Sequence, residues 1–368
     1  MKTIRRLFFK EVIYAVTGVT IGFIALFYFF DFVDELQSVG QNSRLGYQVP
    51  QALMYVALMI PNHLYELLPI TVLIGSIFVM ARFAQSSEFT ILRTSGLGPW
   101  LALRTLLILG MGFVVITFAV GDYVAPMADR AAQMLKAQFK GNVSIGKTGA
   151  WLKERQPYAH YAVNVGALVP GEDMQNIRIY EFDNAGLLIS ITQASSAQFG
   201  DDESWILRNS QRTEFISSES QADRTEKATL DTMRWPTKIS AEMVSAAVLR
   251  PDRMGTIDLF QYIQHLHSNA QSAQKYEIQF WKKVFYPFSC LVMVVLSLPF
   301  AYLHFRSGGI AHYVFGGVMA GISFVLLNNV LGDLGELQGW APWLTAALPG
   351  LIYSFFSLSA FSWLVLRR

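Results

Sequence analysis

The sequence predicts a polytopic α-helical membrane protein of six transmembrane helices, three and three, with a β-sandwich or β-jelly-roll domain inserted between them. Three observations lead to this fold class. The 368 residues are 52% hydrophobic and 15% charged, which is too apolar for an ordinary soluble protein. Six runs approach the roughly 20 residues that a helix needs to cross a bilayer. A polar insert, 123–279, separates the third run from the fourth.

The six apolar runs give the expected spans. Pro61 and Pro69 interrupt the second run, so a kink is expected there. The runs are Val12–Val33, Met54–Ala81, Trp100–Val120, Phe280–Leu303, Tyr313–Leu331 and Trp343–Leu366.

Lysine and arginine in the short connections predict the orientation. The opposite connections hold only Arg44, or Asp333 and Glu336 with no base. The positive-inside rule therefore places both termini in the cytoplasm and the polar insert on the outer side. The basic residues on the cytoplasmic side are Lys2, Arg5, Arg6, Lys10, Arg82, Arg93, Arg306, Arg367 and Arg368.

The residue pattern of the insert changes along its length. Residues 128–140 have helical spacing and continue the third span, and helix returns at 256–266 and from 271 into the fourth span. Between them, short β-rich runs separated by turns predict the β domain. We therefore expect domains at 1–122, 123–279 and 280–368. The β-rich runs are Ala150–Glu154, Tyr158–Val165, Ile177–Phe182, Leu187–Phe199, Trp205–Arg208 and Lys227–Arg234.

Residues Gly141–Thr148 match the phosphate-binding pattern G-x-x-x-x-G-K-T. In nucleotide-binding folds this loop follows a strand and opens a helix. Here a helical stretch precedes the motif and a strand-like stretch follows it, on the outer side of the membrane. The sequence therefore favours a glycine-rich turn over a nucleotide site.

A short polar segment, Arg82–Gly96, lies between the second and third spans and is predicted to be one small cytoplasmic helix. Ser86 or Ser87 can cap its first turn, Glu88 suits the positive end of the helix dipole, and Gly96 can close it.

Catalytic and metal-binding patterns are weak. Cys290, the one cysteine, lies in an apolar run, and the six histidines are scattered. Acidic residues near the membrane are either solvated in the head-group zone or functional, and Glu66 is the hardest to assign to solvent. The others are Asp31, Asp34, Glu35 and Asp122.

Two further groups could contact a lipid. Arg130, Lys136 and Lys140 form a basic stretch beyond the third span, where an anionic head group would meet them, although their spacing does not put all three on one helix face. The aromatic residues of the first span, including Phe23, Phe27 and Phe30, either pack against lipid and other helices or line a cavity for acyl chains.

The order of features along the full chain resembles the LptF/LptG permeases of lipopolysaccharide export. Residues 32–36 and 85–88 resemble the LptG branch more than the LptF branch. The segments that carry the resemblance are Phe32–Leu36, Pro61, Ala84–Phe89, Ser95–Gly96, Val124–Pro126, Trp151–Lys153, Tyr276–Glu277 and Trp281–Pro287.

This resemblance implies a non-catalytic transport subunit in the inner membrane of a Gram-negative bacterium. The subunit would pair with an LptF paralogue and be driven by a cytoplasmic LptB-type ATPase dimer, which binds the ATP and Mg. It would extract lipopolysaccharide and pass it to its periplasmic partners, LptC and LptA, and its β domain would lie in the periplasm. No cofactor on this chain, no metal and no nucleic-acid partner is expected.

The resemblance also implies residue roles. Glu88 matches the acid of the coupling helix, with Gln85, Ser87, Phe89, Leu92 and Arg93 as its neighbours in the ATPase contact. Lys136 matches a basic position for a head-group phosphate.

The outer end of the first span departs from the family pattern. Some members carry lysines there, whereas this chain has Asp31, Gln37 and Ser38. Head-group binding is then shifted to Arg130, Lys136 and the partner subunit, or a divalent cation bridges acid and phosphate. Two other functions stay open from the residues alone: an intramembrane lipid-modifying enzyme, and a receptor or scaffold that does not transport.

Overall fold

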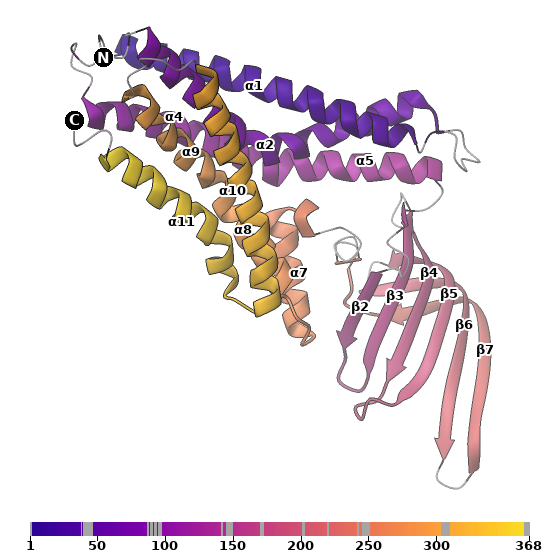
Figure 1. The fold of residues 1–368 in the computed structure, drawn as a ribbon. Coiled ribbons are helices and arrows are strands. Elements are labelled where there is room, and N and C mark those ends of the chain that lie inside the picture. The colour runs from indigo at the N-terminus through magenta and orange to yellow at the C-terminus, as the bar shows by residue number, and fades with distance from the viewer. Residues whose placement is uncertain are drawn as a thin grey trace. The chain divides into compact units, whose positions relative to one another are not determined.

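The chain folds into two compact units, described here from a computed structural model (Figure 1). We call Met1–Glu35, Val56–Ala128 and Glu277–Arg368 the membrane unit, and Leu36–Tyr55 and Asp129–Tyr276 the β-domain unit. The structure describes residues 2–37, 39, 47–86, 88, 91, 94, 98–140, 143–144, 150–169, 173–200, 203–218, 221–240, 243–244, 251–302 and 310–363.

Six helical segments among the described residues are long and apolar enough to cross a membrane, as predicted. They are Arg5–Leu36, Val49–Gln85, Pro99–Lys136, Gln274–Tyr302, Ala311–Gln338 and Pro342–Phe361. Their elements are α1 (Lys2–Leu36), α2 (Val49–Gln85), α4 (Pro99–Ala119), the π-helical turn η1 (Val120–Val124), α5 (Ala125–Lys140), α8 (Gln274–Phe285), the 3₁₀ turn η3 (Tyr286–Phe288), α9 (Ser289–Ser297), the 3₁₀ turn η4 (Leu298–Tyr302), α10 (Ile310–Gln338) and α11 (Pro342–Phe361).

Several helices extend beyond the apolar runs that predicted them. The third span passes through η1 into α5, which confirms that residues 128–140 continue it. Alanine, methionine, lysine and glutamine in α5 are strong helix formers, so the helix continues after the apolar stretch ends.

Close helix packing in the membrane unit depends on small and polar residues. A Cβ on Gly75 of α2 would come within 2.7 Å of the backbone of Val16, so only glycine permits this approach of α1 to α2. One turn along α1, the hydroxyl of Thr20 donates to that of Thr71 at 2.9 Å. Such contacts are typical of membrane helices, which gain little from apolar burial against one another.

The β-domain unit holds one antiparallel sheet, in which the described strands follow the order β1-β3-β4-β5-β6-β7 and β2 also pairs with β3. The inserted antiparallel β domain is therefore confirmed, and β3 to β7 each pair with the next strand in sequence. The strands are β1 (Val143–Ser144), β2 (Ala150–Arg155), β3 (His160–Val169), β4 (Asp173–Phe182), β5 (Leu188–Gly200), β6 (Ser204–Ser218) and β7 (Gln221–Pro236).

Tryptophan side chains form the centre of the sheet's core. Trp205 of β6 is 1% exposed and meets Trp235 of β7 edge to face, with ring centroids 5.3 Å apart. The indole nitrogen of Trp205 donates to the carbonyl of Ile239 at 2.9 Å, which satisfies its one polar atom.

Strand β6 is longer than the predicted run Trp205–Arg208. Asn209 has a φ of 49°, which is a left-handed conformation that asparagine tolerates. Beyond it the strand is largely polar, so it lacks the apolar alternation used for prediction. Pairing with β7 continues to Ser218 and keeps this part extended.

Helix α7 (Thr256–Ser268) joins the sheet through its C-terminal end. The side-chain oxygen of Asn269, the C-terminal cap of α7, accepts from the backbone N–H of Arg155 in β2 at 2.8 Å. His265 is buried beside it, and its ring stacks on Tyr262. Burial lowers the pKa of His265 because it disfavours the charged imidazolium, and the charge of Glu154 opposes this only in part.

The α7 contact should therefore depend on pH. The unfolded state binds a proton near pH 6.5 and the folded state only at lower pH, so stability is full above about 6.5 and falls by up to about 1.4 kcal/mol per pH unit below it. Hydrogen exchange of α7 peptides, corrected for intrinsic rates, would measure this loss. His265→Gln should remove the pH dependence. His267→Gln, at an exposed position, should retain it. The same pH dependence in both variants would show that His265 does not cause it.

Candidate functional site

The predicted coupling segment follows directly from α2. Gln85 ends α2 and is exposed, and Glu88, Ile91 and Thr94 are helical and exposed. Thr94 donates from its hydroxyl to the carbonyl of Ile91 at 2.9 Å. A spacing of three residues places Glu88, Ile91 and Thr94 along one side of a helix. Ser87, Phe89, Leu92 and Arg93 lie outside the described residues.

Among the described residues, the contacts of Ser86 are with α2. Its hydroxyl donates backwards to the carbonyl of Arg82 at 3.0 Å, and its backbone N–H reaches the same carbonyl at 2.9 Å. It therefore closes the C-terminal end of α2. Arg82 in turn forms an ion pair with Glu11 of α1 at 2.5 Å, which ties the start of the coupling segment to α1.

At the other end of α1, Asp31 contacts α2. Its carboxylate lies 2.5 Å from the Nε2 atom of His63, and the His63 ring lies beside that of Phe27 at 5.2 Å between centroids. The side chain of Glu66, which is exposed, accepts from Asn62 at 3.2 Å. Sequence spacing gave no indication of the Asp31 and His63 pair, because it joins positions 32 residues apart.

The three aromatic residues expected to line an acyl-chain cavity occupy different environments on α1. Phe23 packs against a buried cluster of Leu67, Ile70 and Ile74 from α2. Phe27 and Phe30 are exposed, at 36% and 56%. Phe23 thus serves helix packing within this chain, whereas Phe27 and Phe30 present apolar surface.

The basic stretch on α5 is partly engaged within the β-domain unit. The guanidinium of Arg130 forms an ion pair with Asp258 of α7. Next to it, Asp129 is buried and pairs with Arg253 at 2.8 Å. The ammonium of Lys136 lies 4.3 Å from the ring centroid of Tyr55, a cation–π distance. The side chain of Lys140 lies outside the described residues.

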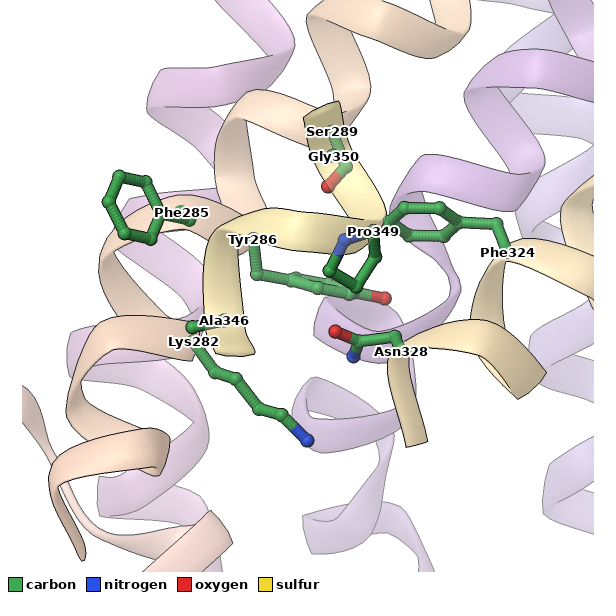
Figure 2. A pocket seen from close by; sticks show the side chains of 9 residues that line it. All are labelled: Lys282, Phe285, Tyr286, Ser289, Phe324, Asn328, Ala346, Pro349 and Gly350. Atoms are coloured by element: carbon green, nitrogen blue, oxygen red, sulfur yellow. The ribbon is translucent and has the colours of Figure 1, made fainter. Parts of the chain in front are cut away.

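A small pocket opens in the membrane unit, with a volume of about 20 Å³ (Figure 2). Binding sites for drug-sized ligands usually span about 300–1,000 Å³, so this pocket is too small for a multi-acylated lipid. It is lined by Lys282, Phe285, Tyr286, Ser289, Phe324, Asn328, Ala346, Pro349 and Gly350.

Sequence reasoning missed Lys283, which is buried in the fourth span. Its exposed fraction is 8%, and its ammonium donates to the backbone carbonyl of Gly121 in η1 at 3.0 Å. The sequence offered two signals: a double lysine at the start of an apolar run, and Pro126 inside a stretch predicted to be continuous helix.

The remaining motifs are only partly described. Val143 and Ser144, inside the phosphate-loop pattern, form β1 and pair with β3. Strand β2 begins at Ala150, where a nucleotide-binding loop would open a helix. Within the described parts of the chain, no group of three histidine, cysteine, aspartate or glutamate side chains could hold a metal ion.

Six candidate spans among the described residues and an inserted antiparallel β domain define a polytopic membrane protein. The family described as lipopolysaccharide export system permease LptF/LptG matches residues 6–367. The chain therefore belongs to the LptF/LptG family of lipopolysaccharide export permeases.

Two curated relatives are similar over nearly the whole chain, and both are named lipopolysaccharide export system permease protein LptG. The protein from Haemophilus influenzae is 26% identical over 356 residues, which cover 96% of each chain. The protein from Escherichia coli K12 is 28% identical over 339 residues, which cover 92% of this chain and 90% of the relative. The resemblance to the LptG branch is thereby confirmed.

Proposed function

We propose that this chain is the LptG-like half of a heterodimeric permease that extracts lipopolysaccharide from the inner membrane of a Gram-negative bacterium. An LptF paralogue forms the other half, and a cytoplasmic LptB-type ATPase dimer supplies ATP hydrolysis. The lipid passes to LptC and LptA by way of the β domain in the periplasm. Both termini lie in the cytoplasm, in keeping with the lysine and arginine pattern.

The exposed face of the coupling segment carries this proposal. Glu88, Ile91 and Thr94, which lie in the chain between α2 and α4, are helical and exposed, and their spacing of three places them along one side of a helix. Ile91 is 61% exposed, although it is a large apolar residue. This face combines an acid, an apolar side chain and a hydroxyl. Such a combination is more typical of a surface that docks into a groove of a partner than of a surface that contacts only water.

Glu88→Ala should uncouple the complex. The lost carboxylate removes a contact with the ATPase, so lipopolysaccharide export should fall at least tenfold, whereas loss of a helix cap alone costs only about 1 kcal/mol of local stability. Export and ATP hydrolysis would be measured in the purified complex. Ser86→Ala is the matched control, because Ser86 is also exposed but closes α2; unchanged export and ATPase assembly in Glu88→Ala would reject the coupling role.

A head-group contact is proposed for the basic stretch on α5. Arg130 forms an ion pair with Asp258, and the Lys136 ammonium lies 4.3 Å from the centroid of the Tyr55 ring. Lysine is a strong partner for lipid phosphates. Lys136, which matches a basic position of the family, is the residue that we propose to contact a phosphate, with Lys140 one turn further along α5.

Crosslinking can test this contact. A photoreactive amino acid at position 136 should form adducts with lipopolysaccharide in the assembled complex, because the phosphate passes within reach of this side chain. Position 104, exposed on α4 toward the predicted cytoplasmic end, serves as the control. Adducts at other outer positions without any at position 136 would exclude Lys136 as a phosphate contact.

A further inference from the structure

Two spans of the membrane unit leave α-helical geometry where they meet α2, which is itself α-helical but carries a proline there. The third span forms the π-helical turn η1, and the fourth forms the 3₁₀ turn η3. Helix α2 contains Pro69, whose missing N–H leaves the carbonyl four residues earlier, on Tyr65, without a helical donor. Irregular turns of this kind inside long helices occur frequently at functional sites.

Pro126 explains why Gly121 needs a partner from another helix. The N–H of Ala125 donates to the carbonyl of Val120, five residues back, as a π-helical turn requires. The next residue in line to serve Gly121 is Pro126, which has no N–H. The Gly121 carbonyl is therefore without its helical donor, and the Lys283 ammonium donates to it at 3.0 Å.

Further contacts join the third and fourth spans to α2 at Tyr65 and Glu66. The Lys283 ammonium lies 5.8 Å from the centre of the Tyr65 ring, and a Cβ on Gly121 would collide with that ring. One turn beyond Lys283, the hydroxyl of Tyr286 donates to the carbonyl of Glu66 at 2.6 Å. We call Tyr65, Glu66, Gly121, Lys283 and Tyr286 the lysine junction.

Filling space between the helices would not require a charged side chain. Burying an ammonium in a membrane span costs several kcal/mol on most scales, and an apolar side chain of similar length would fill the space without that cost. The donor function of Lys283 toward an irregular turn is what an apolar residue could not supply.

Chain connectivity gives the lysine junction its significance. Helices α2 and α4 flank the coupling segment, and both lead to the junction, α2 through Tyr65 and α4 through η1. Tyr65 and Gln85 are 20 residues apart in α2, a separation of about 30 Å along a helix, close to the thickness of the hydrocarbon core. Lys283 lies shortly after the chain returns to the membrane unit at Glu277, and Gly121 shortly before it leaves after Ala128.

We propose that Lys283 is a positioning residue for lipid export, which holds the π-helical turn of the third span to the fourth span and to α2. Movement imposed on the coupling segment reaches both chain passages toward the β-domain unit through this junction. The inference rests on the proposed function, because it assumes that the coupling segment receives work from an ATPase.

The experiment compares substitutions in the complete complex with its paralogue and ATPase, reconstituted in proteoliposomes with lipopolysaccharide. The readout is lipopolysaccharide released to a soluble acceptor per ATP hydrolysed. Lys283→Met removes the donor at similar length, and release per ATP should fall at least tenfold while ATP hydrolysis stays within twofold. Lys283→Arg and Lys283→Gln retain an N–H donor and should recover at least a third of wild-type release per ATP.

Lys282→Met is the matched control, because this neighbouring lysine is half-buried in the same helix but its ammonium lies against Gly332 of α10. Its release per ATP should stay within twofold of wild type. Gly121→Ala provides a second route, since the added methyl group displaces Tyr65 from the junction while Lys283 is intact; it should lower release per ATP as Lys283→Met does.

The outcomes separate the two proposals. Wild-type complex that hydrolyses ATP without releasing lipid would reject the proposed function itself. Wild-type release with equal release per ATP in Lys283→Met would overturn the role of Lys283 alone. If Lys283→Met fails to assemble, the Lys283→Gln, Lys283→Arg and Gly121→Ala variants decide. Wild-type release per ATP in Gly121→Ala would contradict the inference. Release per ATP below a third of wild type in both Lys283→Gln and Lys283→Arg would contradict it as well.

Discussion

The need to satisfy every backbone polar group inside a bilayer is the constraint on which this structure depends. It forces the six spans to be helical, and a proline within them leaves a carbonyl that needs another donor. Pro126 removes the donor for Gly121, and Lys283 replaces it across 162 residues of sequence. The irregular turns are therefore held by specific tertiary contacts.

Two such contacts join the helices of the membrane unit at positions far apart along α2. At the coupling segment, Arg82 ties α2 to α1 through Glu11, and at the lysine junction Lys283 ties the third and fourth spans to α2. Rigid helices between two anchored ends can carry a displacement, which the proposed coupling to an ATPase requires. The family membership fits this organisation, because its members export lipopolysaccharide as permeases.

Local signals in the sequence predicted the helices and strands. Contacts between distant segments determine the length of β6 and the side-chain pairs, which the sequence did not predict. Apolar run length predicted six spans, and alternation predicted the strands of the insert. Strand β6 extended further because its last half is stabilised by pairing with β7, which a single strand's sequence does not report. The pairs Asp31 with His63, Arg130 with Asp258, and Lys283 with Gly121 depend on packing between distant segments, so no spacing rule could find them.

We propose that this chain converts ATP hydrolysis by a partner into movement of lipopolysaccharide. Transfer of lipopolysaccharide from proteoliposomes to a soluble periplasmic acceptor, with and without this chain in the complex, tests this conversion. We expect transfer to require both ATP and this chain, and to stop with a non-hydrolysable ATP analogue. Equal transfer by the complex without this chain, or ATP hydrolysis by the complete complex with no transfer, would contradict it.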